Sequence, residues 1–144
     1  MARQTLDVDC LISDADADGI VEIFEREGFA VTARTENFVR LRHESVRMMD
    51  LDLLLVDVET LSEMLAESAP AGIGPADLRV PSLAHLVALK LHSVRNDPKR
   101  ELGDLSDIVE LLRANPDVVT PEELERLAAE YGPPGALEKI RTQL

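Results

Sequence analysis

The sequence is poor in cysteine and in aromatic residues. Its 144 residues include one cysteine, one tyrosine and no tryptophan. A single cysteine excludes an intramolecular disulfide, and Cys10 lies in the apolar stretch 6–12, so we expect a buried, unreactive thiol. Because nucleic-acid bases stack on aromatic rings, the scarcity of such rings argues against a base-stacking surface.

Long apolar runs and an excess of positive charge are also missing. No apolar segment reaches the roughly 18 residues of a membrane span, and the first residues lack a secretory pattern, so we expect a cytoplasmic protein without a membrane partner. The formal net charge of −13 repels phosphate backbones, and residues 95–100 are the only dense basic cluster. We therefore expect nucleic acid at most as a small acceptor. An acidic protein that handles nucleotides needs divalent cations to mask the phosphates.

The hydrophobic patterns predict one α+β (α/β) domain over residues 1–144. Alternation of period two predicts strands at 5–12, 29–34, 37–43 and 47–57, and three-to-four spacing predicts helices at 15–27, from 59, from 83, at 104–113, from 121 and at 135–143. The last three strands should pair antiparallel, in a mixed or antiparallel sheet of about four strands flanked by helices. The helix after Ser82 is apolar on several sides, so we expect it to pack on the sheet.

Acidic residues stand two apart in two of the predicted strands. Side chains at this spacing project from the same face, which groups Asp7 with Asp9 and Asp50 with Asp52. Neighbouring carboxylates repel unless water or a cation neutralises them, so such a pair with a third carboxylate on an adjacent strand often marks a two-metal phosphoryl-transfer site. The residues alone leave a second interpretation open, in which all four acids face solvent on an antiparallel sheet.

Four segments in order, RQTLDVDCLI, DLLLV, VPSLAHLVALKL and RELGDLSDI, carry a resemblance to a known family. Their order and spacing resemble the minimal nucleotidyltransferases of the polymerase beta superfamily and, more narrowly, the AbiEii-type nucleotidyltransferase toxins and their relatives. The resemblance covers residues 3 to about 113. It implies a sheet-forming nucleotidyltransferase-like core over residues 1–69 and a helical C-terminal part over residues 80–144.

The same resemblance implies a role for each matching residue. The Mg²⁺ ligands would be Asp7, Asp9 and Asp52, and Asp52 would also act as the base for the attacking hydroxyl. The nucleotide, ATP or another NTP, would be bound by Arg3, Thr5, Lys90 and Arg100. The two helical cations would be organised by Asp104 and Asp107. From the residues alone, Lys90 would instead extend its ammonium group along its leucine neighbours to solvent.

The family places a helix and a Gly-Ser or Gly-Gly turn before the Asp-x-Asp strand, whereas six residues precede Asp7 here. We therefore expect either a shortened start or a relative that has lost its phosphate-binding turn. The first hypothesis is transfer of a nucleoside monophosphate from an NTP to a hydroxyl. The second is a non-catalytic interaction module of a toxin–antitoxin-like system, with a protein partner or as a homodimer.

A competing metal motif follows the first predicted strand. The spacing of an EF-hand calcium loop is matched by Asp14, Asp16, Asp18, Gly19 and Glu25. An EF-hand needs an incoming helix, whereas a strand is predicted before Asp14, and acidic residues also suit the positive end of a helix dipole. We favour an acidic helix start and keep a calcium-binding module as the third hypothesis.

Overall fold

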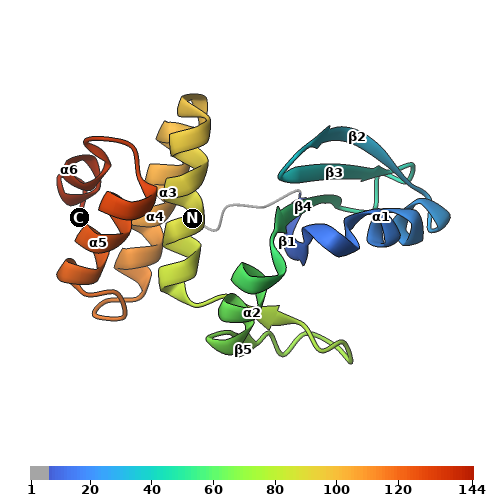
Figure 1. Cartoon of the computed structure of the whole chain (residues 1–144), viewed down its shortest axis with the longest axis horizontal. Coiled ribbons are helices and arrows are strands. Elements are labelled where there is room, and N and C mark those ends of the chain that lie inside the picture. Colours follow the sequence, from blue (N-terminus) through green and yellow to red (C-terminus); the bar gives the residue numbers. More distant parts are fainter. Residues whose placement is uncertain (1–6) are drawn as a thin grey trace. The chain divides into compact units, whose positions relative to one another are not determined.

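The alternating residues of the first half form a four-stranded sheet, as the computed structural model of the chain shows for the described residues, 7–144 (Figure 1). The strands are β1 (Asp7–Ser13), β2 (Phe29–Thr35), β3 (Phe38–His43) and β4 (Asp50–Val56), in the order β1-β4-β3-β2. The pairs β2/β3 and β3/β4 are antiparallel, and β1/β4 is parallel. The predicted meander and the α+β class are confirmed.

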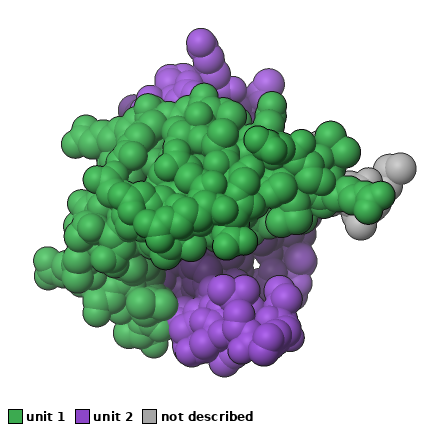
Figure 2. Space-filling view, turned by 90° about the vertical axis from the view of Figure 1, so that its right-hand side faces the viewer, with its two compact units in different colours: residues 1–66 green, residues 67–144 purple. Residues whose placement is uncertain are grey.

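Two compact units divide the chain, residues 1–66 and residues 67–144 (Figure 2). The first unit holds the sheet, the 3₁₀ turn η1 (Asp14–Asp16), and the helices α1 (Ala17–Arg26) and α2 (Val58–Ala66). The prediction of a single domain over residues 1–144 stays a prediction. Each unit has a hydrophobic core of its own.

One face of the sheet is covered by α1. Alternate residues of β3 and β4 lie in this core with the buried face of α1, and the buried set is Ala17, Val21, Phe29, Val39, Leu41, Leu53 and Leu55. Because side chains alternate along a strand, the residues between them project from the opposite face. That second face carries the acidic residues at positions 7, 9, 50 and 52.

Gly28 lies just beyond the end of α1, between this helix and β2. Its φ of 93° lies in the left-handed region, where a side chain is strained. A Cβ at this position would also lie 2.8 Å from His43 Nε2. His43 Nε2 donates a hydrogen bond to Glu27 O, 3.0 Å away, and His43 Nδ1 accepts one from the Ser45 N–H at 2.8 Å. The glycine therefore lets the chain turn tightly against β3.

The second unit is mainly helical. It contains α3 (Leu83–Asn96), η2 (Pro98–Arg100), α4 (Glu101–Ala114), α5 (Pro121–Tyr131) and α6 (Ala136–Arg141). Ser82 and Thr120 cap α3 and α5 by accepting hydrogen bonds from the backbone N–H groups of His85 and Glu123. Between the predicted elements, β5 (Ala69–Pro70) and β6 (Arg79–Val80) form a short antiparallel pair that the sequence pattern did not indicate.

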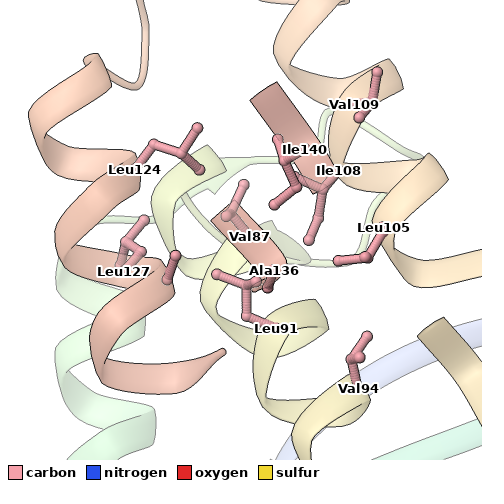
Figure 3. Close-up of a cluster of buried hydrophobic side chains, with 11 residues drawn as sticks. Val87, Leu91, Val94, Leu105, Ile108, Val109, Leu124, Leu127, Ala136 and Ile140 are labelled. Carbon is pink, nitrogen blue, oxygen red and sulfur yellow. The ribbon is translucent and has the colours of Figure 1, made fainter. Parts of the chain in front are cut away.

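The buried side of α3 differs from the prediction. The sequence predicted that it packs on the sheet, but its buried residues Val87, Leu91 and Val94 lie in the helical core of the second unit (Figure 3). Residues of α4, α5 and α6 complete this core, among them Ile108, Leu127 and Ile140. A helix that is apolar on several sides needs several neighbours, and here those neighbours are helices.

Candidate metal and nucleotide site

Three carboxylates meet on the open face of the sheet. The parallel register of β1 and β4 sets Asp9 opposite Asp52 and Asp7 opposite Asp50. One ligand oxygen each of Asp7, Asp9 and Asp52 lies within 4.8 Å of the other two. Asp7 and Asp9 are exposed, whereas Asp52 is only 5% exposed. The structure thus brings together the three residues that the sequence analysis selected as metal ligands.

Two arginines of β3 extend this arrangement across a third strand. The antiparallel register sets Arg40 opposite Asp52. Arg40 Nε and Nη2 donate hydrogen bonds to the two carboxylate oxygens of Asp52, at 2.7 and 2.6 Å. Arg42, two residues along, donates to Asp50 Oδ2 from Nε at 3.1 Å and from Nη2 at 2.9 Å. Across β1, β4 and β3 the face therefore carries two ionic rows, Asp9–Asp52–Arg40 and Asp7–Asp50–Arg42.

These pairs shift the protonation equilibria of their members. The hydrogen bond to Asp52 raises the pKa of Arg40 above its usual value, helped by the charges of Asp52, Asp7 and Asp50. The hydrogen bond between Arg42 and Asp50 lowers the pKa of the Asp50 carboxyl and raises that of Arg42. On the opposite face, burial raises the pKa of the Cys10 thiol, and the charge of Asp9 adds to the increase. The thiol predicted to be buried is half-buried in the structure, and its lack of reactivity stays a prediction.

The donor set suits a hard divalent cation. All three converging groups offer carboxylate oxygens, the ligands that Mg²⁺, Ca²⁺ and Mn²⁺ prefer. Three carboxylates within 4.8 Å also carry like charges that a cation would neutralise. Asp7, Asp9 and Asp52 therefore fit a Mg²⁺ or Mn²⁺ site by ligand type and by mutual distance.

A second ionic group gathers on α3 and α4. Lys90 Nζ lies 2.7 Å from Asp107 Oδ2 and 3.4 Å from Asp104 Oδ1, and Arg100 Nε lies 3.0 Å from Asp104 Oδ2. Asp104 is buried, whereas the Arg100 side chain is exposed. The sequence analysis expected Asp104 and Asp107 to organise the two cations, and the structure places all four residues together. Their contact with a nucleotide remains a prediction.

Comparison with known families agrees with this geometry. A family model described as an uncharacterised nucleotidyltransferase matches residues 1–141. The chain belongs to this family. No match was found among curated proteins. Membership supports the nucleotidyltransferase part of the predicted resemblance, whereas the narrower resemblance to AbiEii-type toxins stays a prediction.

The sequence analysis also selected Arg3 and Thr5 and the acids of a calcium motif. Arg3 and Thr5 lie outside the described residues. The four acids of the calcium motif are not gathered: Asp14 and Asp16 lie in η1, whereas Asp18 and Glu25 lie in α1, about 10.5 Å apart along the helix axis. Asp18 instead accepts a hydrogen bond from Arg34 Nη2 at 2.5 Å. The calcium hypothesis stays a prediction that the fold does not favour.

Arg40 and Arg42 were not among the site residues predicted from the sequence. The signal was present, because the predicted strand 37–43 carries arginines two apart and the next strand carries Asp50 and Asp52 at the same spacing. In an antiparallel pair with a fixed register, such positions face each other.

The helices described in residues 7–144 include none with the length and apolar composition of a membrane span.

Proposed function

We propose that this protein transfers a nucleoside monophosphate from an NTP to a hydroxyl acceptor, using Asp7, Asp9 and Asp52 to hold divalent cations. The observation that carries the proposal is the convergence of these carboxylates across β1 and β4 in a chain of the nucleotidyltransferase family. Bound Mg²⁺ would neutralise phosphate charge and orient the triphosphate. The exposed Asp7 and Asp9 would meet solvent-borne cations first, and Asp52 would complete the ligand set.

In the proposed reaction the acceptor hydroxyl oxygen bonds to the α-phosphorus, and the bond from that phosphorus to the oxygen bridging to the β-phosphate breaks. Pyrophosphate leaves with the electron pair of the broken bond. The hydroxyl proton passes to a carboxylate oxygen of Asp52, the residue that we propose as general base. In the protein without a bound cation, Arg40 donates hydrogen bonds to both Asp52 oxygens and so holds this carboxylate in one orientation beside Asp9.

Within the second unit, we propose Lys90 and Arg100 as contacts to a nucleotide, as the family resemblance implies. Arg100 exposes its guanidinium, and a guanidinium matches phosphate oxygens with paired N–H groups. Arg100→Ala should weaken ATP binding about fivefold or more, the loss expected for one charge-assisted contact. Lys99→Ala removes an equal charge from the adjacent position and serves as the matched control; an equal loss in both variants would contradict a specific contact.

Calorimetric titration with ATP and Mg²⁺ tests the main proposal. We expect binding by the native chain and its loss in Asp9→Asn, because a neutral amide is a poor ligand for Mg²⁺. Glu22→Gln removes the same charge from the exposed surface of α1 and should leave ATP binding unchanged. No heat signal from the native chain, or equal binding by Asp9→Asn, would refute the metal-dependent function.

A second candidate is the non-catalytic interaction module of a toxin–antitoxin-like pair in the cytoplasm. The observation that favours it is the ion pair between Asp52 and Arg40, because this arginine already neutralises the third carboxylate when no metal is bound. A stable complex with a protein encoded beside this chain, together with no response to Mg²⁺ and ATP, would favour this module over the transferase.

A further inference from the structure

Arg40 donates hydrogen bonds to both carboxylate oxygens of Asp52, the same oxygens that would bind a divalent cation. We propose that Arg40 is an exchangeable counter-ion: it pairs with Asp52 when no divalent cation is bound, and it turns to the triphosphate of an incoming nucleotide when the cation takes its place. This inference rests on the proposed metal-dependent function and adds a positioning residue to it.

The charges in the row Asp9–Asp52–Arg40 explain why Asp52 needs a positively charged partner when no metal ion is bound. Asp52 is nearly buried and faces Asp9 across the strand pair, with Asp7 also within reach. Carboxylates at such separations repel, and burial makes an unpaired charge more costly. Two hydrogen bonds of 2.7 and 2.6 Å from the Arg40 guanidinium offset both costs.

The surroundings of Arg40 allow it to leave. Its side chain is 42% exposed, whereas that of Asp52 is 8% exposed, so the arginine can move into solvent and the aspartate stays in the sheet. The Arg40 guanidinium carbon lies 5.5 Å from the centre of the Phe38 ring, which offers a cation–π contact independent of Asp52. A divalent cation bound by the three carboxylates would repel the guanidinium.

A guanidinium displaced from Asp52 could bind the phosphate groups of a nucleotide at the metal site. Its N–H groups form a planar fork that matches the oxygens of a phosphate, and a nucleoside triphosphate brings such oxygens to a bound cation. Removing Arg40 should therefore change two affinities in opposite directions. The cation should bind more tightly because its competitor is gone, and the nucleotide should bind more weakly because a phosphate contact is lost.

Arg40→Ala, with Arg42→Ala as the matched control, tests this exchange. Free Mn²⁺ is followed by electron paramagnetic resonance, and ATP binding is measured by calorimetry at saturating Mn²⁺. In Arg40→Ala we expect Mn²⁺ to bind about fivefold to tenfold more tightly and ATP about fivefold to tenfold more weakly. Arg42→Ala, whose partner Asp50 lies outside the converging trio, should change both affinities less than about twofold.

Any other combination of changes in Mn²⁺ and ATP affinity would contradict the proposed exchange. If the native chain binds Mn²⁺ and ATP but Arg40→Ala shifts both affinities in one direction, or neither, the exchange is wrong and the metal-dependent function stands. If neither the native chain nor Arg40→Ala binds Mn²⁺, both proposals fail. Circular dichroism checks folding, and Arg40→Lys, which keeps the charge but loses the fork, should give the same signs with smaller changes if Arg40→Ala does not fold.

Discussion

Asp9 and Asp52 face each other across the parallel strands β1 and β4, yet one is exposed and the other is buried against an arginine. The pair therefore combines two different structural roles in one row of the sheet. Asp52 is part of the packed structure through Arg40, whereas Asp9 lies at an exposed position of β1. Loss of the Asp52 charge should therefore lower the stability of the fold.

We expect Asp52→Asn to lower the free energy of unfolding by about 1–2 kcal/mol in the absence of metal. The substitution removes a charge-assisted acceptor from Arg40, and the cost is reduced because the Arg40 side chain is 42% exposed. As a control, Glu22→Gln on the exposed surface of α1 should stay within about 0.5 kcal/mol of the native chain, as exposed substitutions usually do. Chemical denaturation without divalent cations measures both, and equal effects would show that the Arg40 contact contributes no stability.

Acid should weaken the row that contains Asp50. The Arg42 hydrogen bond lowers the Asp50 pKa from its usual 3.8, so the unfolded chain binds this proton at higher pH than the folded chain does. The stabilising contribution is thus complete above about pH 4 and is lost as the pH falls through the lowered folded value. The difference in Tm between the native chain and Arg42→Ala should be largest near neutral pH and should shrink below about pH 4.

Arg47→Ala provides the control for this titration. It removes an equal charge from the exposed loop before β4 and leaves the Arg42–Asp50 pair intact. Thermal melts of the three proteins between pH 7 and 3 separate the effect of the pair from that of net charge, since overall charge affects both variants alike. A constant difference in Tm for Arg42→Ala across this range would contradict the pairing.

The carboxylate site could be predicted because it depends on local periodicity. Asp7 and Asp9 share a face by the period of a strand, and the resemblance supplied Asp52 as the third group. The structure gathers these three. Arg40 was missed because its pairing depends on the register between β3 and β4, which follows from turn geometry and from the burial of Val39 and Leu41.

The position of α3 shows a second limit of sequence reasoning. Its apolar residues correctly indicated a helix with extensive burial, and Ser82 correctly marked its start. Periodicity reports how much of a helix is buried but not which element buries it. Val87 and Leu91 pack among other helices, and that choice depends on residues such as Ile108 and Leu127, which lie well beyond α3 in the chain.

Gly28 should be far less tolerant of substitution than Gly19. Gly28→Ala forces a side chain into φ 93° and sets its Cβ 2.8 Å from His43 Nε2, so we expect a loss of about 1–2 kcal/mol or more. Gly19→Ala places a Cβ in open space within α1, where the higher helix propensity of alanine should add about 0.5–1 kcal/mol. Denaturant unfolding measures both changes, and a loss at Gly19 with none at Gly28 would contradict the described turn.

The helical second unit should fold without the first. Its core consists of buried residues between Val87 and Ile140, and the core of the first unit ends at Leu55. A fragment of residues 67–144 should therefore give a helical circular dichroism spectrum and a cooperative melt. A disordered fragment would instead support the prediction that residues 1–144 form one domain.

Two leucine substitutions test whether the stability of the fragment 67–144 depends on the described helical core. Leu91 is fully buried, so Leu91→Ala should lower the free energy of unfolding of the fragment by about 2–5 kcal/mol. Leu102 is 89% exposed in α4, so Leu102→Ala should change it by no more than about 0.5 kcal/mol. Equal losses in the two variants would mean that α3 does not occupy the centre of this helical core.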